Sequence, residues 1–201
     1  MKNSMIILAF FVAGVGLGIG ELLPDVVMEN DFSMYALYVL MFLVGVGIGA
    51  DKKSWSVLRS MNLKIVLIPV GIIVGTLLGT AATSFLLNGV SLKEAMAVGA
   101  GFGYYSLSSI FITQISGETL GVTALLANIL REIITLLGTP LLVNYFGKIA
   151  GIASGGATSM DTTLPIIVKY SGKEWAIISV FSGIVLTVLV PFLVTFILEF
   201  F

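Results

Sequence analysis

The sequence predicts an all-α integral membrane protein, and both its composition and its recurring apolar runs favour this class. Of its 201 residues, 58% are hydrophobic and only 10% are charged, with a mean hydropathy of +1.11. In soluble domains about a quarter of the residues are charged. Runs long enough to cross a hydrocarbon core of about 30 Å recur from end to end. We therefore expect one membrane domain over residues 1–201, built of helices that satisfy their own backbone groups in lipid.

The apolar runs between polar breaks predict about seven transmembrane helices, one or two of them broken. They cover residues 5–23, 32–50, 63–87, 92–115, 119–146, 149–170 and 175–199. The first has a Gly-rich second half and no cleavage site before a polar start, so we expect it to be retained rather than removed as a signal peptide. The fourth and sixth are rich in Gly, Ser and Thr. They could cross or re-enter the membrane, and we expect both to cross.

Basic residues predict the orientation, because cytoplasmic loops collect Lys and Arg. The loop at 51–62 holds Lys52, Lys53 and Arg59, whereas the loop before it holds three acidic residues and no base. We expect the 51–62 loop and the N-terminus to be cytoplasmic and the C-terminus to lie outside.

The absence of cysteine and histidine excludes disulfides, thiolate or imidazole metal sites and His-assisted nucleophiles. We therefore expect no cofactor, no metal site and no enzyme. An intramembrane aspartyl protease using Asp51 and Asp161 is disfavoured, because Asp51 falls in the basic loop. The net charge of −1 without a basic stripe indicates no nucleic-acid partner.

The strongest local signal is the segment 154–165, Ser-Gly-Gly-Ala-Thr-Ser-Met-Asp-Thr-Thr-Leu-Pro, between apolar flanks. Paired glycines, hydroxyl residues and a proline disfavour a continuous helix. Unwound backbone at membrane depth is tolerated where it is buried or lines a cavity, which is how secondary transporters form sites. We expect Asp161 to bind substrate or protons, supported by Ser159 and Thr162. The alternative is a kinked packing helix or an interfacial loop in which Asp161 is solvated.

Glu132 lies near the middle of the span 119–146, too far from either end to reach water. Asn128, Thr135 and Thr139 share its helix face. This polar stripe predicts a cavity or a polar neighbouring helix, with Glu132 binding substrate or protons and Asn128 in support.

Arg131 points about 100° away from Glu132. It could pair with a carboxylate such as Asp161, or it could cap the carbonyls of a broken helix. The alternative for Arg131 and Glu132 is a buried pair that only stabilises packing. Tyr104 and Tyr105, in the Gly-rich fourth span, could line a cavity or pack in the core.

Alternating glycines at 13–24 and 44–49 favour close helix packing. An alternative interpretation of the 13–24 segment is a second broken helix that carries Glu21. The first and sixth spans lie five steps apart and therefore run in opposite directions, as inverted repeats of five helices require. Such an arrangement would leave three helices missing from the start.

Three segments together resemble the lysine exporter family, LysO: residues 101–109 (GFGYYSLSS), 128–132 (NILRE) and 155–165 (GGATSMDTTLP). The resemblance covers essentially the whole chain. It implies export of L-lysine from the bacterial cytoplasm across the inner membrane, with two required intramembrane acids at Glu132 and Asp161. It also implies a relation to cation/proton antiporters and bile-acid symporters, whose two inverted five-helix repeats contain crossing broken helices.

Against that family the chain lacks the first part, about three helices, and resembles the larger part of a split exporter. We expect a small membrane chain with about three helices, or a second copy, as partner. The expected mechanism is antiport with protons or another cation. The alternative is a channel or scaffold subunit without active transport.

Overall fold

The computed structural model describes residues 13, 14, 16–20, 35, 39, 42, 46, 63–87 and 89–201. Contacts divide the chain into two units, 1–46 and 47–201, and each is considered by itself. The described residues of the first unit are almost all helical, and Glu21 and the 51–62 loop lie outside the described residues. The described part contains helices and no strands, which confirms the all-α class.

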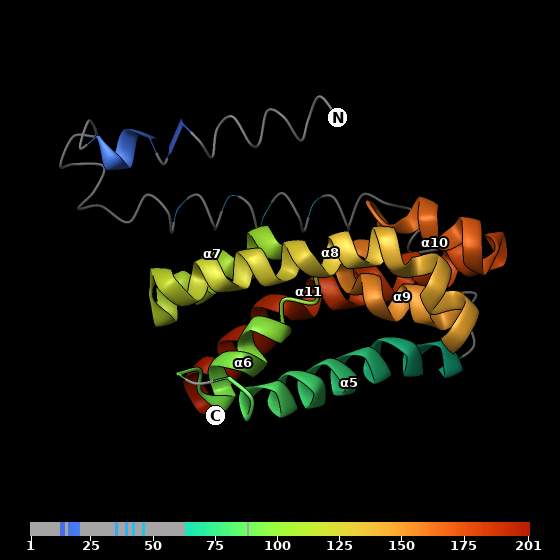
Figure 1. The fold of residues 1–201 in the computed structure, drawn as a ribbon, viewed down its shortest axis with the longest axis horizontal. Coiled ribbons are helices and arrows are strands. Elements are labelled where there is room, and N and C mark those ends of the chain that lie inside the picture. Colours follow the sequence, from blue (N-terminus) through green and yellow to red (C-terminus); the bar gives the residue numbers. More distant parts are fainter. Residues whose placement is uncertain are drawn as a thin grey trace. The chain divides into compact units, whose positions relative to one another are not determined.

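Among the described residues of the second unit, three helices are long and apolar enough to cross a membrane, namely α5 (Leu67–Ser84), α8 (Glu118–Phe146) and α11 (Ala176–Phe200). Their 18, 29 and 25 residues span about 27, 43 and 37 Å at 1.5 Å per residue. A short 3-10 turn, Leu63–Val66, precedes α5. These helices match the third, fifth and seventh predicted spans (Figure 1).

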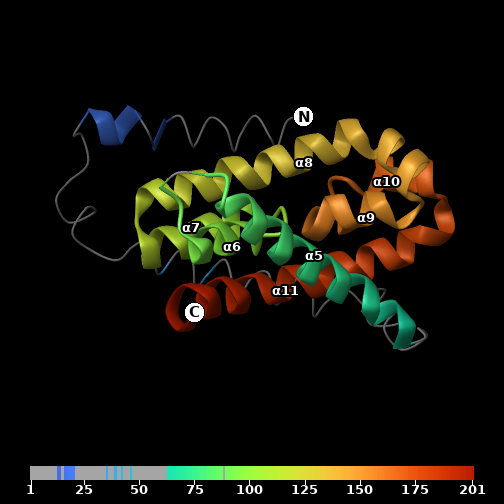
Figure 2. The same ribbon diagram turned by 60° about the horizontal axis from the view of Figure 1, so that its bottom comes forward.

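The fourth apolar segment forms a helical hairpin, here called the first hairpin (residues 92–116). Its arms are α6 (Leu92–Gly99) and α7 (Tyr105–Ser116), about 12 and 18 Å long. Both arms lie in the same half of the unit, with the bend near its middle (Figures 1 and 2).

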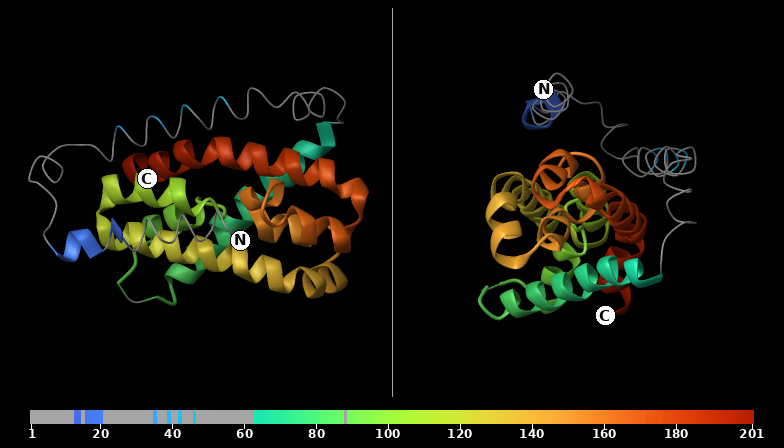
Figure 3. Two further views of the ribbon diagram at one scale, coloured as in Figure 1. Left: turned by 90° about the horizontal axis from the view of Figure 1, so that it is seen from above. Right: turned by 90° about the vertical axis from the view of Figure 1, so that its right-hand side faces the viewer.

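The sixth segment forms the second hairpin (residues 149–171), which enters from the opposite end (Figure 3). Its arms are α9 (Ile149–Gly155) and α10 (Leu164–Ser171), joined by a 3-10 turn, Gly156–Met160. The Ser171 hydroxyl donates to the Lys148 carbonyl at 2.8 Å, so the two ends of the segment meet. A second 3-10 turn, Lys173–Trp175, leads into α11.

The prediction that the fourth and sixth segments cross is therefore wrong. Each arm is short enough to reach only about halfway through a 30 Å core. The chain turns back where Phe102 and Gly103 have φ of 47° and 94°, and again where Gly156 has φ of 60°. A left-handed conformation ends a right-handed helix.

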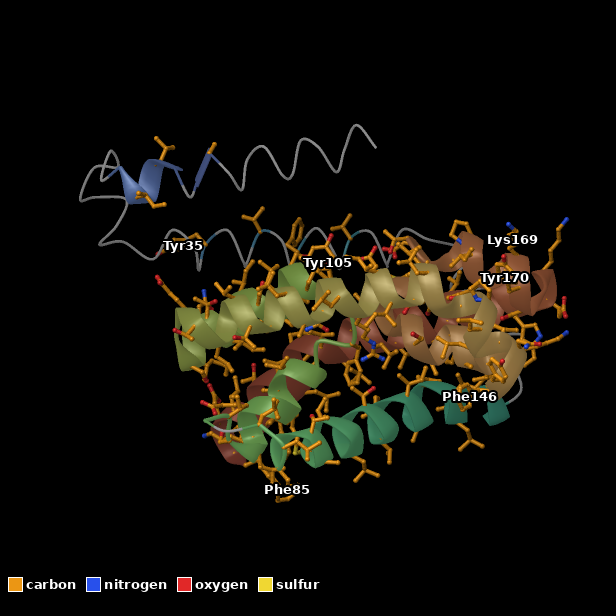
Figure 4. The ribbon with its side chains drawn as sticks, in the orientation of Figure 1. Tyr35, Phe85, Tyr105, Phe146, Lys169 and Tyr170 are labelled. Carbon is orange, nitrogen blue, oxygen red and sulfur yellow. The ribbon has the colours of Figure 1, made fainter. Side chains whose placement is uncertain are left out.

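Exposed side chains mark the two ends of the second unit. Phe146, Lys169 and Tyr170 lie at one end and Phe85 toward the other, while Tyr105 lies between them (Figure 4). Tyr105 is the first residue of α7, so the bend of the first hairpin lies between the two ends.

Candidate functional site at the hairpin tips

The tips of the two hairpins meet and bond to each other. The backbone N–H of Ala157 donates to the carbonyl of Phe102 at 2.8 Å. A Cβ atom at Gly156 would collide with that same carbonyl oxygen. The contact therefore requires glycine for space as well as for its positive φ.

Asn128, near the middle of α8, holds the first hairpin. Its Oδ1 accepts from the N–H of Gly103 at 2.7 Å, and its Nδ2 donates to the Val98 carbonyl at 3.1 Å. The N–H of Gly103 is freed where the helix breaks, and in lipid it needs a partner. The predicted supporting residue Asn128 thus positions the hairpin tip.

Arg131 holds the second hairpin one turn further along α8. Its Nε donates to the Ser154 carbonyl at 2.9 Å, and its Nη2 donates to the Ala153 carbonyl at 3.0 Å. Of the two roles expected for Arg131, the structure shows the second, in which it caps the carbonyls of a broken helix. Within the described part Arg131 has no ion pair with a carboxylate. Thr135 shares a hydrogen bond of 2.7 Å with the Ser154 hydroxyl.

Ser159 binds the tip of the second hairpin to α11. Its hydroxyl donates to the Ser179 carbonyl at 3.0 Å, and the Ser179 hydroxyl donates to the Ser159 carbonyl at 2.7 Å. Both side chains are fully buried. Beside them Gly183 lies so close to Met160 that a Cβ atom would not fit. Ser159 is therefore bound within the fold rather than facing a ligand space.

Asp161 follows the tip and borders a half-open hollow. Its Oδ1 accepts from the backbone N–H of Thr162 at 2.5 Å and from the Thr162 hydroxyl at 3.4 Å. The carboxylate is exposed, as is Thr162. Both hairpins and α11 line the hollow, through Tyr104, Ala157, Thr158, Met160, Asp161 and Thr187.

Glu132 lies on α8 at the depth of the tips and is half-buried. Its carboxylate has no hydrogen bond or ion pair within the described part of the chain. Both Glu132 and Asp161 act electrostatically on the hydroxyl of Tyr105, and Asp161 also acts on Tyr104. The structure thus brings both predicted acids within electrostatic reach of Tyr105.

The lining of the hollow suits a cation. It contains one carboxylate, three hydroxyl groups, an aromatic ring and a thioether, and no basic side chain. Sequence reasoning proposed Asp161 and the tyrosines but missed Met160 and Thr187. No sequence signal marks Thr187, because hydroxyl residues in apolar helices commonly bond only to their own backbone.

Comparison with known proteins shows which family the chain resembles. A family model described as lysine exporter LysO matches residues 8–198. The chain is 30% identical over 167 residues to lysine exporter LysO of Escherichia coli (strain K12), covering 83% of this chain and 55% of that protein. It is 32% identical over 190 residues to a "Putative lysine exporter" of Haemophilus influenzae, covering 90% of this chain and 92% of that one. The chain spans about half the length of the first relative and nearly all of the second. No solved structure matches.

Proposed function

Because this chain belongs to the lysine exporter LysO family, we propose that it is a secondary transporter. It exports L-lysine, or a related cationic amino acid, across the bacterial inner membrane. Export is driven by antiport with protons or another cation. One observation carries the proposal: two opposed hairpins meet in the middle of the unit and place Asp161 in a hollow without a base.

The two carboxylates supply the charge that such a substrate needs. An ionised acid at mid-membrane depth is costly and is normally retained for function. Glu132 and Asp161 both lie at the depth of the tips, one on α8 and one on the second hairpin. Lysine carries two ammonium groups, so two acids on neighbouring elements match it. Exchange of the cationic substrate for protons at these acids would make the cycle an antiport.

The charges at the two ends support the expected orientation. The end where the second hairpin enters carries three lysines and one acid, namely Lys148, Lys169, Lys173 and Glu174. The other end carries one lysine and three acids, namely Lys93, Glu94, Glu118 and Glu199. Under the positive-inside rule the first end faces the cytoplasm. The second hairpin then enters from the cytoplasm, the first hairpin from outside, and the C-terminus lies outside.

The exposure of Asp161 supports a partner that completes the site. A carboxylate at this depth is not stable against lipid, so protein or water must face it. We propose that a small membrane chain of about three helices, or a second copy of this chain, covers it. Copurification in mild detergent, followed by mass determination, distinguishes the two. An isolated monomer that exports lysine at full rate would contradict both.

Lysine efflux from loaded cells tests the function. We expect Glu132→Gln and Asp161→Asn each to abolish most of the efflux, because both variants lose the charge that binds the cation while keeping the size of the side chain. Glu118→Gln is the matched control, since Glu118 is exposed in the first turn of α8. Membrane protein levels are measured in parallel. Full efflux in both acid variants would refute the proposal.

The alternative, a channel or a scaffold subunit, makes a different prediction. A channel dissipates a lysine gradient and a scaffold does nothing alone, whereas an antiporter builds a gradient when an opposing proton gradient is imposed. Proteoliposomes with a pH difference and equal lysine on both sides separate these cases. Net lysine movement that follows the direction of the pH difference supports antiport, and its absence favours the alternative.

A further inference from the structure

We propose that the hollow beside Asp161 receives the side-chain ammonium group of the transported amino acid, and that Thr187 and Tyr104 bind it there. Asp161 faces this hollow from the second hairpin, Tyr104 from the first hairpin and Thr187 from α11. The inference rests on the proposed function and adds to it the end of the substrate that enters and two specificity-determining residues.

The first argument is the unused hydrogen-bonding capacity of Asp161. Its Oδ1 is occupied by the backbone and hydroxyl of Thr162. Its Oδ2 accepts no hydrogen bond from the described part of the chain. An ammonium group carries three donors and no acceptor, so the open oxygen of Asp161 supplies a charged acceptor for one of them.

The second argument is Thr187, which is only 2% exposed and yet has no strong partner. Within the described part of the chain its hydroxyl makes one hydrogen bond, a donation to the Met160 sulfur at 4.0 Å, and a thioether is a weak acceptor. By contrast, Thr135 and Thr139 donate to carbonyls of their own helix at 2.8 and 2.5 Å. Buried hydroxyls are normally satisfied. The Thr187 hydroxyl therefore indicates a polar ligand in the hollow that it lines.

The third argument decides which end of the amino acid enters. The α-carboxylate needs a donor, but no basic side chain lines the hollow, and Arg131 donates to Ser154 and Ala153 instead. The tyrosine ring and Met160 offer apolar wall to methylene groups. The side-chain end therefore enters, and the α-amino acid end stays outside. A compact ammonium fits three clustered acceptors better than a planar guanidinium does.

Calorimetric titration of the purified full chain in detergent tests this with three probes. They are lysine, 6-aminohexanoate, which keeps the terminal ammonium but lacks the α-ammonium, and norleucine, which lacks the terminal ammonium. We expect 6-aminohexanoate to bind and to compete with lysine, and norleucine to do neither. Norleucine that competes as well as 6-aminohexanoate would overturn the inference, and this comparison needs no variant.

Variants at Thr187 then test the residue itself. Thr187→Val removes the hydroxyl at nearly constant size, and we expect it to weaken 6-aminohexanoate binding about tenfold or more, since the lost hydrogen bond joins a charged group. Thr187→Ser should restore binding. The matched control is Thr123→Val, because Thr123 is exposed on α8 and bonds only to its own helix at 2.8 Å. Equal binding by Thr187→Val and the control would overturn the assignment.

Failure of the inference and failure of the function are distinguishable. If cells export lysine but norleucine competes with lysine on the purified chain as well as 6-aminohexanoate does, the proposed function is supported and the ammonium subsite is refuted. If 6-aminohexanoate binds in a way that depends on Thr187 but the chain transports no lysine, the subsite is supported and the proposed function is refuted. Variants are compared only where their elution on gel filtration matches that of the unaltered chain.

Discussion

Replacement of Asn128 by alanine separates a structural role of this residue from a role in binding substrate. The variant orphans the N–H of Gly103, which the amide oxygen of Asn128 now accepts from at 2.7 Å. The carbonyl of Val98 loses the Asn128 amide at 3.1 Å but keeps the N–H of Gly101 at 3.3 Å. Asn128 is only 3% exposed, so water does not replace it. An orphaned buried group costs about 1–3 kcal/mol, whereas polar bonds between membrane helices average about 0.6 kcal/mol. For the one orphaned group we expect a loss of about 1–3 kcal/mol.

Unfolding by denaturing detergent in mixed micelles, followed by circular dichroism, measures this loss. Asn144→Ala is the matched control, because Asn144 is exposed on the same helix and makes no hydrogen bond within the described part. A purely ligand-binding Asn128 would lose lysine transport with no loss of stability. Equal unfolding free energies for the two variants would therefore refute the role of Asn128 in holding the hairpin.

Three further predictions concern the junction of the hairpins and the entry to the second one. Gly156→Ala should strongly lower thermal stability, because its Cβ would collide with the first hairpin and its φ is 60°. Gly138→Ala should be tolerated, because a Cβ there has no neighbour nearer than 3.8 Å. Equal melting temperatures of the two variants would count against the contact between the hairpins. Arg131→Lys should lower stability although the charge is kept, because one ammonium cannot reproduce the planar fork; an unchanged melting temperature would show that the fork is not needed. Hydrogen bonds from its own backbone and from Lys148 hold the pKa of Glu174 below its usual value. The Lys148–Glu174 pair should therefore stabilise the fold at pH values above the pKa that Glu174 has in the unfolded chain. This stabilisation should be lost as the pH falls through the lower pKa of Glu174 in the folded chain. A melting temperature with the same pH dependence in Glu174→Gln would contradict this.

The crossing helices could be predicted because their signal is local. The runs that become α5, α8 and α11 are long and apolar whatever lies beside them, and lipid requires such runs to be helical. The hairpins could not be predicted with the same certainty. Their Gly, Ser and Thr residues are compatible with a kinked crossing helix, and what decides is side chains distant in sequence. Asn128 satisfies the first break and Arg131 the second.

The candidate site was predictable to a similar degree. Glu132 and Asp161 stand out because acids are rare in apolar segments. The polar stripe on α8 was also visible, but whether Asn128 faces a substrate or a neighbouring backbone depends on which element lies opposite. Ser159 shows the same ambiguity, since its burial against α11 follows from the close approach at Gly183. The roles of Glu132 and Asp161 in binding stay predictions.

The hydrogen bond between Ala157 and Phe102 makes each hairpin part of the other's support. Neither tip can withdraw alone without exposing a peptide group to a medium that offers it no partner. A displacement of one hairpin alone would therefore have to break this peptide-to-peptide hydrogen bond. The two half-length insertions are thus joined at their tips, beside Asp161.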